Sequence, residues 1–133
     1  MNKQITTITF FKFSSLSSKI WGFIMMLFAH NELHKVKGLS FYRLMGSGKG
    51  KGFNPLPDWS VYSLIQVWES EEVANKFFNS SNLIKKYKSY TVEIYTLYMK
   101  NIAAVGTWIN KIPFKKGTDL NSNLPIAIIT RAT

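Results

Sequence analysis

The two histidines of this chain, His30 and His34, are the side chains best suited to bind a metal ion. They lie four residues apart near the end of a segment that predicts a helix, so both would occupy one face of that helix. A neutral imidazole there could ligate zinc or serve as the axial ligand of a haem iron. No acidic residue completes a zinc-protease motif, which disfavours zinc. The alternative is a pair of polar residues at a helix end, where the helix dipole favours them.

Other catalytic chemistry is thinly represented. Asp58, Glu69 and Glu93 are too far apart along the chain to predict a carboxylate pair for acid–base work. The absence of cysteine excludes disulfides, thiolate metal sites and cysteine nucleophiles. No serine occupies the strand-to-helix elbow of the serine hydrolases. If the chain is an enzyme, a cofactor is therefore expected to supply the difficult step.

The segment 44–58 contains four of the eight glycines and two of the four prolines. It connects two predicted strands, Leu39–Met45 and Val61–Trp68, and such a loop is typical of a binding or active site. A mobile basic surface loop is the alternative. The glycines and lysines do not match a phosphate-binding loop, and two prolines separate them from a strand rather than a helix. The same prolines disfavour the strand motif of an RNA-recognition module.

The order of the predicted elements is strand–helix–strand–strand–helix–strand. It indicates an α+β ferredoxin-like plait, in which an antiparallel sheet carries both helices on one face. The bare face would pair with a second copy, a cofactor or another domain. We expect a domain over 1–100, a loop or linker over 101–123, and the start of a second, truncated half over 124–133. The strands are predicted at Ile5–Phe13, Leu39–Met45, Val61–Trp68 and Thr91–Met99, and the helices at Lys19–His34 and from Ser70 to about Ser89, interrupted at 80–82.

Composition and charge suggest the partners. Hydrophobic residues make up 46% and aromatic residues 15% of the chain, and the formal net charge is +10. These values favour an apolar pocket or partner surface together with contact to anionic lipids, anionic ligands or polyanions. The apolar run Ile20–Ala29 is too short to span a membrane. We interpret it as a buried or surface-docking helix of a cytoplasmic protein, either free or peripheral to a membrane. Its apolar stripe comprises Ile20, Phe23, Ile24, Leu27 and Phe28.

Several short motifs follow one another along the chain, namely Gly38–Gly48 (GLSFYRLMGSG), Gly52–Pro55 (GFNP), Pro57–Asp58, Val61–Leu64 (VYSL), Trp68, Tyr95–Tyr98 (YTLY), Gly106–Trp108 and Pro113–Phe114. In order and spacing they resemble the spheroidene monooxygenase family of carotenoid oxygenases. The glycine-serine-glycine to proline-aspartate block is the specific part of this resemblance. Members of the family are longer, so the resemblance covers their amino-terminal half only, and Ile109-Asn110 departs from the small-residue turn that is usual there.

The resemblance implies a dimeric α/β-barrel relative of the plait, binding haem b and inserting oxygen from O₂ into an apolar, carotenoid-like molecule. A homodimer or the missing second half would complete the fold. His30 or His34 is the candidate iron ligand, and Arg43 is the candidate partner for a haem propionate. The residues implied to shape the substrate pocket are Gly46, Ser47, Gly48, Gly52, Phe53, Asn54, Pro55, Asp58, Tyr62 and Trp68.

The leading hypothesis is therefore a haem-dependent monooxygenase held near a membrane that stores its substrate. A second hypothesis is a non-enzymatic basic module that binds an anionic ligand, RNA or a membrane surface. A third is an inactive truncated remnant. Salt-sensitive retention on RNA or liposomes without visible absorbance would favour the second hypothesis.

Overall fold

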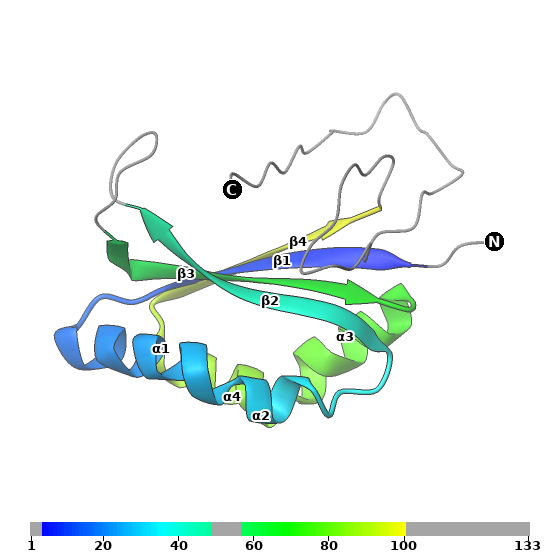
Figure 1. Cartoon of the computed structure of the whole chain (residues 1–133), viewed down its shortest axis with the longest axis horizontal. Coiled ribbons are helices and arrows are strands. Elements are labelled where there is room, and N and C mark those ends of the chain that lie inside the picture. The colour runs from blue at the N-terminus through cyan, green and yellow to red at the C-terminus, as the bar shows by residue number, and fades with distance from the viewer. Residues whose placement is uncertain (1–3, 49–56, 101–133) are drawn as a thin grey trace.

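The computed structural model describes residues 4–48 and 57–100, in which one antiparallel sheet carries all the helices on a single face (Figure 1). The predictions over 49–56 and 101–133, including the truncated second half, lie outside the described residues. The elements are β1 (Ile5–Lys12), α1 (Leu16–Phe28), α2 (His30–Leu33), β2 (Leu39–Gly48), β3 (Pro57–Trp68), α3 (Glu71–Ser80), α4 (Asn82–Tyr90) and β4 (Glu93–Met99).

The sheet has the strand order β2-β3-β1-β4, and every neighbouring pair is antiparallel. This confirms the predicted ferredoxin-like plait, in which β3 and β1 are the two interior strands. β2 and β3 extend further than predicted, because Gly48 pairs with Pro57. A proline is tolerated at that position because it is the first residue of its strand.

Serine side chains set the beginnings of three helices. The Ser15, Ser70 and Ser81 hydroxyls accept hydrogen bonds from backbone N–H groups in the first turns of α1, α3 and α4. Ser81 also ends α3, so the predicted interruption of the second helix is confirmed. Gly38 lies in the turn that leads into β2 and has a positive φ of 82°, which glycine adopts without strain.

The first helix packs differently from an ordinary amphipathic helix. Its small and flexible residues Ser18, Gly22 and Met25 face the sheet. The predicted apolar stripe lies on the opposite side, exposed to solvent. The sequence left two interpretations of Ile20–Ala29, a buried helix and a surface-docking helix. The exposure of the stripe contradicts the first. Among the described residues, no helix is both long and apolar enough to cross a bilayer.

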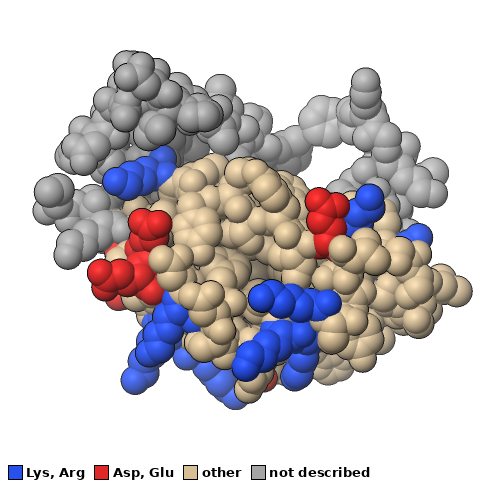
Figure 2. All heavy atoms as spheres, turned by 180° about the vertical axis from the view of Figure 1, so that it is seen from behind, with Lys and Arg blue, Asp and Glu red and all other residues tan. Residues whose placement is uncertain are grey.

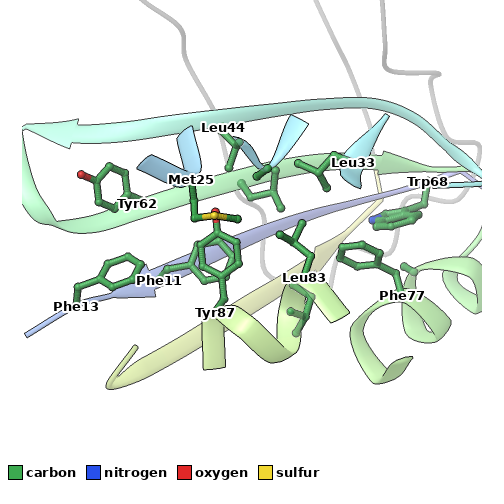
Figure 3. Close-up of a cluster of buried hydrophobic side chains, with 14 of the residues drawn as sticks. Phe11, Phe13, Met25, Leu33, Leu44, Tyr62, Trp68, Phe77, Leu83 and Tyr87 are labelled. Carbon is green, nitrogen blue, oxygen red and sulfur yellow. The ribbon is translucent and has the colours of Figure 1, made fainter. Parts of the chain in front are cut away.

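The hydrophobic core lies between the sheet and the helices (Figure 3). Phe11 of β1 stacks on Tyr87 of α4, with ring centroids 4.1 Å apart. Trp68 of β3 packs against Phe77 of α3 at 5.1 Å. Aromatic pairs at these separations add to the stability gained from burying their area. The core therefore ties the two central strands to both the third and the fourth helix.

The opposite face of the sheet has no described helix upon it (Figure 1). Four of its apolar side chains are nevertheless buried, and none of them belongs to the core under the helices. Phe10 and Tyr95, on neighbouring strands of the same face, are exposed. The face is therefore apolar, as predicted, and only partly exposed. The four buried residues are Ile8, Phe41, Ile65 and Val67.

Candidate functional site

The two candidate iron ligands lie on the helical side of the molecule, and both are exposed. His30 begins α2, and its Nδ1 lies 3.1 Å from the hydroxyl of Tyr42 on β2. His34 ends α2, and its Nδ1 donates a hydrogen bond to the carbonyl oxygen of His30, 2.5 Å away. Because a carbonyl can only accept, His34 carries its proton on Nδ1. Its Nε2 lone pair is then available to a metal.

The described residues contain no group of three or more acidic, histidine or cysteine side chains arranged to hold a metal ion. This disfavours a zinc site, which usually needs three or four protein ligands. A haem iron is less demanding, because one imidazole suffices as its axial ligand. Two interpretations of the histidines therefore remain, namely a single axial ligand of a haem iron or a pair of polar residues at a helix end.

Arg43 does not join the histidines within one chain. It lies opposite Ile65 in the register of β2 and β3, and its neighbours Tyr42 and Leu44 contact the helical side. Successive side chains of a strand point to opposite faces of the sheet. Arg43 therefore lies on the helix-free face, whereas His30 and His34 lie on the helical side. A propionate partner for a haem bound at α2 would have to come from another residue.

The predicted pocket residues also divide between different environments. Gly46, Ser47 and Gly48 end β2, where Ser47 pairs with Asp58 of β3. Tyr62 and Trp68 are buried in the core under the helices rather than at a loop. The remaining predicted positions, Gly52, Phe53, Asn54 and Pro55, lie outside the described residues.

A row of polar side chains crosses the interior between the sheet and the helices. Tyr42, Gln66 and Thr7 are cross-strand neighbours on β2, β3 and β1, so they share one face of the sheet. Thr7 and Gln66 are both fully buried, at 0% exposure. The Thr7 hydroxyl accepts a hydrogen bond of 2.9 Å from the indole N–H of Trp68. That bond shows that the row faces the helices, where the Trp68 ring packs.

Gln66 is the unusual member of this polar row. Neither its amide nitrogen nor its amide oxygen has a hydrogen-bond partner within the described part of the chain. Burial of a polar group without a partner costs about 1–3 kcal/mol, so such groups are uncommon and call for a partner such as a bound water, an ion or a ligand. The sequence held a signal that our prediction missed, namely a single amide in the apolar run from Leu64 to Trp68.

The polar row reaches the surface through Tyr42. Its phenol is hydrogen-bonded to His30, and the two rings lie 5.5 Å apart. Partial burial raises the pKa of Tyr42 above its ordinary value, so the phenol stays protonated at neutral pH. The candidate site is therefore a buried amide, Gln66, beside a protonated phenol whose hydroxyl contacts an exposed imidazole.

No protein-family model matches the chain. Curated proteins do match it. The chain is 32% identical over 130 residues to the spheroidene monooxygenase of Cereibacter sphaeroides, covering 98% of this chain and 40% of that protein. The chain resembles the spheroidene monooxygenases. It is also 27% identical to the enzyme of Rhodobacter capsulatus, covering 96% of this chain and 54% of that protein. The resemblance predicted from the loop motifs is thus confirmed as a partial match, since the chain spans about half the length of these relatives.

Solved structures share the fold at low sequence identity. SnoaB, a cofactor-independent oxygenase from Streptomyces nogalater, superposes with a TM-score of 0.54 at 8% identity, covering 77% of this chain and 97% of SnoaB. A dimeric protein of unknown function and ferredoxin-like fold from Bacteroides fragilis gives 0.53 at 12% identity, covering 73% and 95%. These likenesses confirm the ferredoxin-like fold.

Proposed function

We propose that this chain acts as a monooxygenase on a carotenoid or a similar apolar polyene. The observation that carries the proposal is the match of nearly the whole chain to the spheroidene monooxygenase of Cereibacter sphaeroides. Such a reaction places one atom of O₂ in the substrate and reduces the other to water with two electrons from a reductant. The side chains packed in the interior of the plait are aromatic and aliphatic, and so chemically similar to a hydrocarbon substrate.

We assign Gln66 to bind the oxygenated end of the polyene product. A polyene offers almost no polar atoms, whereas its oxidised product carries a hydroxyl or keto oxygen. The amide of Gln66 has a spare donor and a spare acceptor in an apolar interior. It can therefore donate to a keto oxygen, or accept from a hydroxyl while donating to it. Tyr42, next in the row, would supply a second donor because its phenol stays protonated.

Haem b is the proposed cofactor, and when bound it would supply the activation of O₂. The donor chemistry of His34 fits an axial ligand, because its Nδ1–H is held by a backbone carbonyl and its Nε2 is available. His30 is the second candidate, through the same atom. Both rings are exposed, so a further surface would have to enclose the haem. A homodimer would provide it, as would the additional length present in the relatives.

The first experiment adds haemin to the purified chain and records the absorption spectrum. The proposal predicts that the Soret band of haemin shifts on binding to the chain. The shift should be lost in one of the two variants His34→Ala and His30→Ala, and that variant identifies the iron ligand. The second experiment supplies a carotenoid in detergent micelles with labelled O₂ and a chemical reductant. Mass spectrometry should then detect one labelled oxygen atom in the product. Gln66→Leu should abolish this product while the variant stays folded.

The outcomes separate the parts of the proposal. Product formation without any Soret shift would reject haem as the cofactor. It would support oxygenation without a cofactor, which is the chemistry that the name of SnoaB describes. A Soret shift that survives both histidine substitutions would reject the assigned ligands. The absence of product both with and without haemin would refute monooxygenase activity for this chain.

A further inference from the structure

The outer face of α1 is a continuous apolar surface. Leu16 is 76% and Leu27 is 68% exposed, although leucine normally lies in the core. Positions 16, 20, 23, 24, 27 and 28 all fall on one side of a helix with 3.6 residues per turn. We call this surface the α1 apolar stripe; its residues are Leu16, Ile20, Phe23, Ile24, Leu27 and Phe28.

The packing of α1 fixes the α1 apolar stripe on the outside. A Cβ atom added at Gly22 would lie 2.9 Å from the buried ring of Phe13 and 3.1 Å from that of Tyr62. Only a residue without a side chain fits there, so Gly22 sets which side of the helix faces the sheet. The large apolar residues cannot rotate inward without placing bulk against those rings. Their exposure therefore follows from the fold and calls for a partner.

The charges around the stripe are almost all positive. Trp21 of α1 stacks on Tyr90 of α4 with ring centroids 4.1 Å apart, which places the two helices side by side on the same face of the sheet. The segments 16–38 and 82–90, which hold α1, α2 and α4, contain six lysines and one acidic residue, Glu32. In Figure 2, the view from behind, most blue side chains of that face lie over the helical layer. The lysines are Lys19, Lys35, Lys37, Lys85, Lys86 and Lys88.

We propose that the outer surface formed by α1 and α4 docks on an anionic lipid bilayer. The α1 apolar stripe enters the boundary between headgroups and acyl chains, as in interfacial helices with an apolar face and flanking lysines. Lys85, Lys86 and Lys88 of α4 contact the anionic headgroups beside it. The exposed Tyr90 lies between the two, at the depth where membrane proteins concentrate aromatic rings.

Charge selects the bilayer over a second copy of the chain. Two copies joined through α1 would bring their α4 lysines towards each other, and juxtaposed like charges oppose association. An anionic surface neutralises the same lysines. The residues substituted in its test belong to α1 and α4 and include neither Gln66 nor the histidines assigned to haem, so vesicle binding can be measured separately from the oxygenase activity.

The experiment measures binding of the full 133-residue chain to vesicles by co-sedimentation. The vesicles contain phosphatidylglycerol and phosphatidylcholine, or phosphatidylcholine alone. The double substitution Phe23→Ser with Leu27→Ser should weaken binding to anionic vesicles by roughly tenfold or more, because two apolar side chains no longer enter the lipid. Replacing Lys85, Lys86 and Lys88 by glutamine should weaken it by about tenfold or more and reduce its dependence on salt.

A matched pair of variants tests whether vesicle binding is specific to the α1 apolar stripe or is a non-specific effect of any exposed aromatic residue. Phe28 is 57% exposed on α1, and Tyr95 is 56% exposed on the opposite face of the sheet. Phe28→Ser should weaken vesicle binding, whereas Tyr95→Ser should leave it unchanged. Equal effects of the two substitutions would overturn the proposal, as would wild-type chain that stays in the supernatant. If the Phe23→Ser and Leu27→Ser variant loses self-association of the wild-type chain but still binds vesicles equally well, the membrane proposal is overturned and the α1 apolar stripe is a protein–protein interface.

Discussion

Replacing Gln66 by leucine should stabilise the protein. The side chain is fully buried on β3, and both polar atoms of its amide lack a partner within the described residues. Relief of that unpaired burial is worth about 1–3 kcal/mol in the free energy of unfolding. Leucine has a similar volume and adds apolar contact with the core. The expected result is therefore a gain of about 1–3 kcal/mol, with the loss of the binding role assigned to the amide.

The assay is urea unfolding followed by tryptophan fluorescence, because Trp68 is buried two residues away on the same strand. Thr7→Val is the matched control, since it also removes a polar group from the same row. It would leave the Trp68 indole N–H without its acceptor and should destabilise the fold by about 1–3 kcal/mol. The two substitutions should thus have opposite signs. A destabilising Gln66→Leu would show that the amide is satisfied, and would remove the physical basis for its assignment to a ligand.

Three other substitutions test the packing. Gly38→Ala should destabilise by about 1–2 kcal/mol or more in urea unfolding, because its φ is +82° and its new Cβ would lie 2.5 Å from Val73; a neutral result would contradict that backbone geometry. Gly22→Ala should lower the unfolding free energy by about 1–3 kcal/mol through overpacking against Phe13; unchanged stability would mean that α1 can move away from the sheet. Burial, and secondly the nearby Tyr62, raise the pKa of Tyr87 above the ordinary tyrosine value of 10.0. The contribution of the neutral phenol to the free energy of unfolding is therefore fully present below about pH 10, and it decreases as the pH rises further, because the unfolded chain then loses the proton more readily. Tyr87→Phe should flatten that alkaline fall in urea midpoints, and an unaltered fall would reject Tyr87 as its source.

The sequence was sufficient to predict the four strands and the helical segments between them. The helix bounds were less well predicted, because the single helix expected over Lys19–His34 begins at Leu16 and is divided into α1 and α2. Alternating apolar residues and serine caps act locally, so their signals survive without knowledge of the tertiary structure. The almost continuous apolar character of Val61–Trp68 is also typical of a strand in the interior of a sheet, which is where β3 lies. The partial likeness to the spheroidene monooxygenases came from the loop block rather than from the helices.

The orientation of α1 and the make-up of the site could not be predicted in the same way. A helix that is apolar nearly all round has no unique buried face, and the deciding residue was Gly22, which packs against residues far away in sequence. Strand register decided which residues share the site, because it placed Arg43 on the face of the sheet opposite to His30. The same register brought Gln66 beside Thr7 and Tyr42, which no local pattern reveals.

The position of β1 in the sheet determines the order in which the chain can assemble. β1 is made first, yet its two neighbours are β3 and β4, and the Thr9 and Thr96 hydroxyls that meet across the β1–β4 pair are 87 residues apart in sequence. Such distant partners slow folding, because a long loop must close before any pairing energy is gained. A fragment that ends before Glu93 would lack β4 and would leave one side of β1 with free backbone hydrogen-bonding groups. Expression trials that shorten the carboxyl end past that residue should yield aggregates.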